Sequence, residues 1–273
     1  MSLLRSVTLG QYVPGASLAH RLDPRAKLGI LAIGTASTFT CQHVVPALLP
    51  GAAAIVGAGA AGLRMRWFVS GLRAVVPLVA LSLLANALFG QGEDVIARLG
   101  PIAVTRESLQ HGLLMSARLL SLYLLTSLFT LTTSPVRLTD ALESILSPFR
   151  RIGLPTSDLS TAVSIALRFI PTLADHADKI MKAQISRGAR LNEGRLLSRA
   201  RALVPVLVPL FVQAFHAAEA LAEAMESRCY RGVGRTRLCE IRGSGIDLIA
   251  VWGVGALALA LSAFDGLRWP GGP

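Results

Sequence analysis

Two arginines stand between small residues where two long segments end, and their type and setting suit them to bind a partner. Ser186-Arg187-Gly188 closes the first segment, and Ser227-Arg228-Cys229 closes the second. A guanidinium group presents its N–H donors as a rigid fork that matches a carboxylate, and small neighbours allow another protein to approach closely. The pattern predicts two similar docking points for two similar partner surfaces.

A local interpretation of each arginine is also open. The carbonyl groups in the last turn of a helix lack partners, so a positive charge there opposes the negative end of the helix dipole. This would be sufficient for a single arginine. Because two similar endings follow two adjacent long segments, the docking interpretation gains weight.

The other residue types that carry chemistry follow no functional spacing. Cys41, Cys229 and Cys239 form no CxxC pair, and we expect them to be small reduced side chains. The five histidines form no HExxH motif, and the glycine-rich run at 57–62 lacks the GK[ST] ending of a phosphate-binding loop. We therefore expect no metal site, no catalytic centre and no cofactor bound by this chain.

The composition is typical of a membrane protein. Of 273 residues, 52% are hydrophobic and 16% are charged, and the mean hydropathy is +0.56, whereas about a quarter of the residues of a soluble domain are charged. Several apolar runs approach or exceed about 18 residues, the length of a membrane-spanning helix. The net charge of +11 is more typical of cationic cytoplasmic loops than of nucleic-acid binding. The prediction is an all-α, polytopic helical membrane protein.

The apolar runs predict about five spans. Residues 1–27 are polar and cationic and form a predicted cytoplasmic N-terminal segment, at whose end Asp23 caps a helix that starts at Pro24. Residues 28–133 hold about four transmembrane helices, and residues 246–264 form a C-terminal one.

Within these runs, residues 91–106 and Arg118 stand out. The loop at 91–106 carries no excess of cations, so we place it outside. Arg118 lies inside a predicted span, where a charge costs a few kcal/mol unless it meets a partner or reaches the interface. A functional role and snorkelling are both open for this residue.

Residues 134–243 interrupt the apolar pattern. They hold 16 of the 27 Lys and Arg residues and 10 of the 16 Asp and Glu residues. The excess of cations predicts a cytoplasmic domain, and four spans from a cytoplasmic N-terminus return the chain to the same side. Two long helices are expected here, one with Pro171 as a kink or break and one that starts near Leu196, with Pro205 and Pro209 in its first half.

Short segments in chain order resemble a known family: Gly-Gln-Tyr at 10–12, His-Arg-Leu-Asp-Pro-Arg at 20–25, Thr-Thr-Ser-Pro at 132–135, Leu-Thr-Asp-Ala-Leu at 138–142, Gly-Leu-Pro at 153–155 and Ala-Leu-Arg-Phe-Ile-Pro-Thr-Leu at 166–173. Together with the endings at 183–188 and 224–232, they resemble the transmembrane T component (EcfT) of energy-coupling factor (ECF) transporters, which are ABC-type importers. That family includes the cobalt-transport Q subunit, CbiQ. The resemblance covers about residues 8–240.

The resemblance implies a non-catalytic scaffold in the inner membrane of a prokaryote. Its cytoplasmic coupling helices would link two ABC ATPase subunits, which bind the ATP, to a membrane substrate-binding S component for vitamin or metal-ion uptake. Arg187 and Arg228 would dock into the ATPases. The family's coupling motif is usually Ala-Arg-Gly, so Ser186 and Ser227 are mild changes, whereas Cys229 in place of the second glycine leaves the turn geometry open.

Two other classes are alternatives. A self-contained secondary transporter would show inverted repeats and ionisable residues at mid-membrane depth, but apart from Arg118 the predicted spans carry almost none. A polytopic membrane enzyme would need clustered acids or histidines at ligand spacing.

Overall fold

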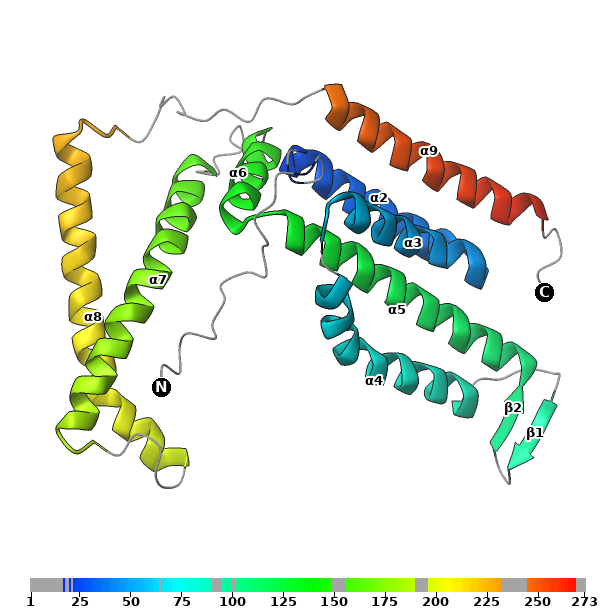
Figure 1. The fold of residues 1–273 in the computed structure, drawn as a ribbon, viewed down its shortest axis with the longest axis horizontal. Helices are drawn as coiled ribbons and strands as arrows, with labels where there is room; N and C mark the ends of the chain where they lie inside the picture. The colour runs from blue at the N-terminus through cyan, green and yellow to red at the C-terminus, as the bar shows by residue number, and fades with distance from the viewer. Residues whose placement is uncertain are drawn as a thin grey trace. The chain divides into compact units, whose positions relative to one another are not determined.

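A computed structural model describes residues 17, 20, 22–63, 65–89, 95–99, 102–148, 156–189, 196–231 and 245–268 (Figure 1). These residues form long helices and one short hairpin, so the predicted all-α class is confirmed. The elements in chain order are α2 (Pro24–Thr40), α3 (Val44–Ala60), α4 (Met65–Phe89), β1 (Val95–Leu99), β2 (Ile102–Thr105), α5 (Arg106–Thr132), α6 (Pro135–Leu146), α7 (Thr156–Ser186), α8 (Leu196–Ser227) and α9 (Gly245–Arg268).

The elements divide into two units. Helices α6, α7 and α8 belong to a unit that includes residues 135–240, and the other elements belong to a unit of residues 10–134 and 241–273. We call the first the helical-arm unit and the second the membrane unit. The division lies close to the sequence prediction, but the cytoplasmic location of 134–243 stays a prediction.

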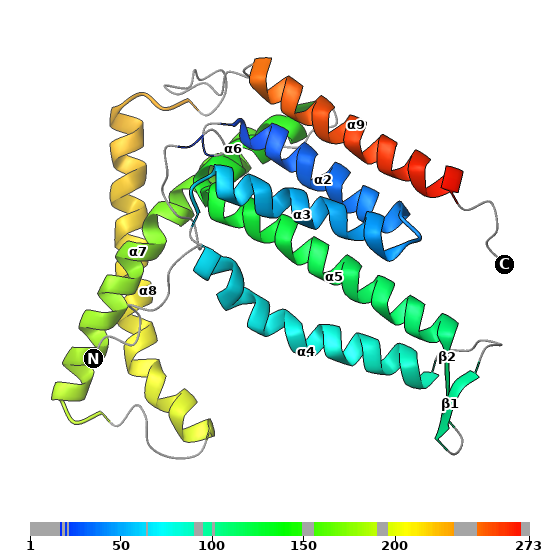
Figure 2. The ribbon, with the colours of Figure 1, turned by 45° about the vertical axis from the view of Figure 1, so that its right-hand side comes forward.

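Helix α5 is the centre of the membrane unit. It packs against α2, α3 and α4, while α9 packs against α2. Both ribbon views show these helices side by side, with α9 and α4 on opposite sides (Figures 1 and 2). Three of the described helices contain a stretch long and apolar enough to cross a membrane: Gly71–Leu88, Arg106–Thr132 and Arg201–Ser227. The chain is a multi-pass membrane protein.

The third of these stretches lies in α8, which the sequence prediction places in the cytoplasm. Length and composition alone therefore do not separate α8 from a membrane span. The prediction for α8 rests on the charge of the whole segment, and the apolar side chains of this helix need a partner or a membrane surface.

Small residues allow close packing around α5. Gly51 of α3 lies against Ser121 of α5, and the Ser121 hydroxyl donates a hydrogen bond of 2.7 Å to the Ala47 carbonyl. On the other side of α5, the Tyr123 hydroxyl donates to the Phe68 carbonyl of α4 at 2.9 Å. Such small and hydroxyl side chains are typical of helix contacts in membranes, where backbones must approach closely.

The start of α2 confirms the predicted cap. The Asp23 side chain accepts a hydrogen bond of 2.9 Å from the Arg25 N–H, and Pro24 occupies the first helical position. This geometry satisfies one of the N–H groups that have no partner in the first turn.

Arg118 meets a partner inside the membrane unit. Its Nη2 donates to the carbonyls of Phe39 at 3.2 Å and Cys41 at 2.9 Å, where α2 ends. The guanidinium thereby satisfies carbonyl groups that the helix leaves free, and its charge opposes the helix dipole. These bonds give the half-buried arginine a structural role.

The hairpin of β1 and β2 was not predicted. Its strands pair antiparallel, with Leu99 opposite Ile102 and Val95 opposite Thr105. Short apolar stretches on both sides of Gly100-Pro101 were the available signal in the sequence. From the sequence, residues 91–106 are expected only to form a loop.

The contact between Gly51 and Ser121 predicts that a single methyl group destabilises the membrane unit. A Cβ on residue 51 would lie 2.8 Å from the Ser121 Oγ and 2.9 Å from its Cα. We expect Gly51→Ala to cost about 1–3 kcal/mol, measured as a lower unfolding temperature in detergent. Gly59→Ala in the same helix meets no atom within 4 Å and is the matched control, so equal stability of the two variants would contradict this packing.

Candidate coupling site

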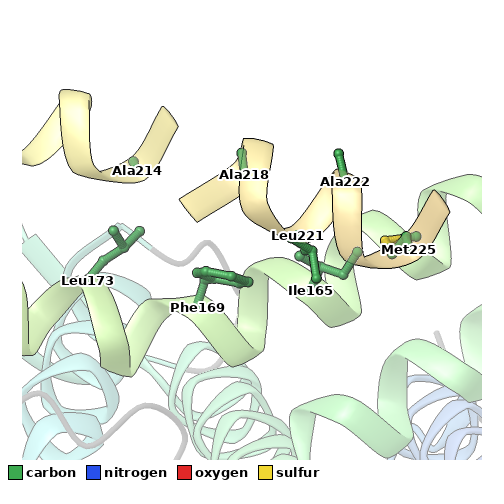
Figure 3. A pocket seen from close by; sticks show the side chains of 8 residues that line it. All are labelled: Ile165, Phe169, Leu173, Ala214, Ala218, Leu221, Ala222 and Met225. Carbon is green, nitrogen blue, oxygen red and sulfur yellow. The ribbon is translucent and has the colours of Figure 1, made fainter. Parts of the chain in front are cut away.

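Apolar faces join the two helices that carry the candidate arginines. Helix α7 packs against α8, and the side chains of the contact lie opposite one another (Figure 3). They line an apolar cavity of about 290 Å³: Ile165, Phe169 and Leu173 from α7, and Ala214, Ala218, Leu221, Ala222 and Met225 from α8. Apolar side chains of the two helices therefore face one another across this cavity. Because α8 presents mainly alanines here, the larger α7 side chains do not fill the space between the helices.

The two helices run antiparallel. Ile165 lies near the Leu221–Met225 end of α8, whereas Leu173 lies near Ala214 (Figure 3). Farther along α7, the Gln184 Nε2 donates to the Pro205 carbonyl at 3.5 Å. The C-terminal ends of α7 and α8 therefore lie at opposite ends of the pair. At 1.5 Å per residue, Arg187 is about 33 Å along α7 from the level of Ile165.

The end of α7 is a Schellman turn. Gly188 adopts a left-handed conformation with a φ of 88°. Its N–H donates to the Ile185 carbonyl, and the Ala189 N–H donates to the Gln184 carbonyl, both at 2.9 Å. These two bonds satisfy carbonyl groups of the last turn. Arg187 is the residue between the helix and this turn, and its side chain is exposed.

The end of α8 repeats this geometry with a different residue. Cys229 adopts the left-handed conformation with a φ of 58°. Its N–H donates to the Glu226 carbonyl at 2.8 Å, and the Tyr230 N–H donates to the Met225 carbonyl at 3.0 Å. The sequence left the geometry of this turn open, because Cys229 stands where the family usually has glycine. The structure has the same left-handed turn as at Gly188, and Arg228 occupies the same exposed position as Arg187.

A third helix ends in the same way without an arginine. In α3, Gly62 has a φ of 67°, its N–H donates to the Gly59 carbonyl, and the Leu63 N–H donates to the Ala58 carbonyl. Ala61 occupies the position of the two arginines. The turn itself therefore forms without a guanidinium group. This weakens the interpretation that Arg187 and Arg228 serve only to stabilise the ends of their own helices.

The serines beside the two arginines bond to their own helices. The Ser186 hydroxyl donates to the Lys182 carbonyl and the Ser227 hydroxyl to the Ala224 carbonyl, both at 3.0 Å. Each predicted group of Ser186, Arg187 and Gly188, or Ser227, Arg228 and Cys229, thus lies on one turn. The two groups are not brought together into a single site.

Prolines do not interrupt either helix. Helix α7 continues through Pro171, which the sequence had suggested as a possible break, and α8 continues through Pro205 and Pro209. Pro209 has no N–H to donate to the Pro205 carbonyl four residues earlier. The Gln184 side chain donates to that carbonyl instead. This contact escaped sequence analysis, although prolines four residues apart signal a free carbonyl.

Comparison with known proteins agrees with the resemblance found in the sequence. The model of the CbiQ family, described as cobalt transport protein, matches residues 15–238. The energy-coupling factor transporter transmembrane protein EcfT of Thermosediminibacter oceani is 45% identical over 257 residues, which are 94% of this chain and 97% of that protein. The proteins of the same name from Heliobacterium modesticaldum and Bacillus subtilis are 46% and 38% identical, over 92% and 95% of this chain and 96% and 98% of their own lengths.

The left-handed residues at the two ends predict opposite effects of two substitutions. Cys229→Gly removes a side chain from a conformation that costs L-residues about 1–2 kcal/mol, whereas Gly188→Ala adds that cost. We expect hydrogen exchange of the Tyr230 amide to slow about fivefold in the first variant, and that of the Ala189 amide to accelerate similarly in the second. Changes of the same sign in both variants would refute the assignment of these turns.

Proposed function

The chain belongs to the CbiQ family of cobalt transport proteins, and on that premise we propose that it is the transmembrane coupling subunit of an ECF importer. It links two ABC ATPase subunits to a membrane S component that binds the substrate, a vitamin or a metal ion. The chain itself is non-catalytic, and the ATP is bound by its partners. The three relatives named above are energy-coupling factor transporter transmembrane proteins, and their names support this role.

The repeated helix ending is the observation that carries the proposal. Arg187 and Arg228 each lie exposed between the last turn of a long helix and a left-handed residue. A guanidinium held there can form two parallel bonds with a carboxylate of a partner. Because the same turn ends α3 without an arginine, the two guanidinium groups are available for docking.

The antiparallel arrangement favours two separate partners. Since Arg187 lies about 33 Å along α7 from the level of Ile165, and Arg228 follows the end of α8 that lies near Ile165, one small acidic patch does not reach both arginines. Two copies of one ATPase, or two similar ATPases, each with a site for one arginine, match this spacing. The excess of cations in 134–243 supports a location of these ends in the cytoplasm of a prokaryotic cell, beneath the inner membrane.

An exposed apolar stripe on α8 is the proposed contact for the S component. Its members recur at the three- and four-residue spacing of one helix face: Leu203, Val204, Leu207, Val208, Phe211, Val212 and Phe215. Phe211 and Phe215 are 63% and 67% exposed. Continuous exposed apolar surface of this kind marks a protein or membrane contact. The stripe lets α8 meet an apolar protein at the membrane boundary.

The mechanism follows from these contacts. When ATP closes the two ATPases, the docked arginines and their helices move with them. The α7–α8 contact leaves a cavity lined on the α8 side mainly by alanines, so the helices can adjust against one another at low steric cost. This movement passes along α8 to the stripe, where it tips or releases the S component.

Reversal of the charge at both arginines tests the docking. In Arg187→Glu with Arg228→Glu, we expect the two ATPases to be lost from a pull-down in mild detergent, because a carboxylate then faces a carboxylate. Exposed Arg168 and Lys179 of α7 provide the matched control, since Arg168→Glu with Lys179→Glu changes the net charge equally. Retention of the ATPases by the first double variant, or their loss from both, would refute docking through the two helix ends.

Substitutions in the apolar stripe should release the S component and leave the ATPases bound. We expect Phe211→Ser with Phe215→Ser to reduce the co-purified S component about tenfold, because two aromatic side chains that the S component would cover are removed, while both ATPases remain bound. Quantitative mass spectrometry of the purified complex measures both ratios. Parallel loss of the S component and the ATPases would show that the stripe supports the whole assembly instead.

A further inference from the structure

A buried lysine of the first helix holds the last turn of α5. Lys27 is only 8% exposed, and its Nζ donates a hydrogen bond of 2.9 Å to the Thr132 carbonyl. Thr132 is the last residue of α5, and 105 positions separate the two residues in sequence. This bond joins the beginning of one helix to the end of another.

The position of Lys27 is unfavourable for its own helix. It is the fourth residue of α2, where the positive end of the helix dipole disfavours a cation. Burial of an ammonium group is costly unless it is hydrogen-bonded. The end of α5 compensates both effects, because a carbonyl in the last turn lacks a helical partner and carries the negative end of that dipole. The positive charge of Lys27 is therefore more favourable at the end of α5 than at the start of α2.

The held carbonyl lies where the membrane unit ends. Thr133 and Ser134 follow Thr132, and Pro135 begins α6 and the helical-arm unit. Any force carried along the chain from α6 into the membrane unit acts first on the last turn of α5. A turn that frays under this force would absorb the movement instead of passing it to the helices behind it.

A second bond extends this anchor to α9. The Asp247 carboxylate, 8% exposed, accepts a hydrogen bond of 2.9 Å from the Asp23 N–H, at the cap of α2. Residues 23 and 247 lie 224 positions apart. The first turn of α2 is thus bonded to the end of α5 on one side and to the start of α9 on the other.

We propose that Lys27 is a positioning residue for coupling: it fixes the last turn of α5 to α2, so that movement of the helical-arm unit is passed to the membrane helices. This inference rests on the proposed function, since it assumes that the helical-arm unit is moved by ATPases. The role is mechanical, and Lys27 touches neither ATP nor the transported solute.

The test compares Lys27→Met with Arg25→Met in the complete complex, reconstituted in liposomes with its native S component. Both variants remove one cation from the first turn of α2, but the Arg25 side chain is exposed. We expect Lys27→Met to bind the ATPases and hydrolyse ATP normally, with transport per ATP reduced about tenfold, the effect of losing a charged hydrogen bond. Arg25→Met should keep the normal ratio, and Lys27→Arg, which retains a cationic donor, should restore most of it.

Hydrogen exchange of the isolated chain in detergent gives an independent result. Amides 129–133 should exchange faster in the folded fraction of Lys27→Met than in Arg25→Met, even if less of the variant folds. Unchanged exchange, or equal transport per ATP in the two variants, would overturn the role of Lys27. Failure of the proposed function would look different: the Arg187→Glu, Arg228→Glu complex would keep its ATPases, while the exchange difference at α5 remained.

Discussion

Carbonyl groups in the last turn of a helix have no backbone hydrogen-bond partner within that helix, and two arrangements that satisfy them recur in the described part of this chain. In the membrane unit, Arg118 donates to the end of α2 and Lys27 donates to the end of α5. At the ends of α3, α7 and α8, a left-handed residue turns two backbone N–H groups toward the same kind of carbonyl. A cation from another helix fastens two helices together, whereas a left-handed turn leaves the neighbouring side chain free to point outward.

This difference separates Lys27 and Arg118, which bond to helix ends, from Arg187 and Arg228, which we propose to bind partner subunits. Lys27 is buried and Arg118 is half-buried, and each is bonded to backbone of its own unit. Arg187 and Arg228 lie on turns that close without them, so their charge is not needed to end the helix. The two arginines therefore remain available to carboxylates of partner subunits. Between them, the antiparallel α7–α8 pair sets the separation of the two proposed docking points.

Much of this arrangement could be predicted from the sequence, because long apolar runs and helix caps leave strong local signals. Asp23-Pro24 gave the start of α2, and Leu196 is the first residue of α8, as expected. Contacts between distant segments left no such signal: the partner of Arg118, the bond from Lys27 to Thr132 and the contact of Gln184 with Pro205 depend on packing. Of the two effects expected at Pro171, a kink or a break, the break does not occur, since neighbouring contacts can hold a helix together where one hydrogen bond is missing. The turn at Cys229 could not be predicted, because a side chain at positive φ is locally unfavourable.

Two equivalent helix ends imply a fixed stoichiometry. Native mass spectrometry of the complex purified through a tag on this chain would count the ATPase subunits bound to each copy. Docking at Arg187 and Arg228 predicts two ATPase subunits per chain, together with one small membrane protein. A complex that holds a single ATPase subunit, or a native chain that purifies alone under conditions that preserve related transporters, would contradict the coupling role of the two arginines.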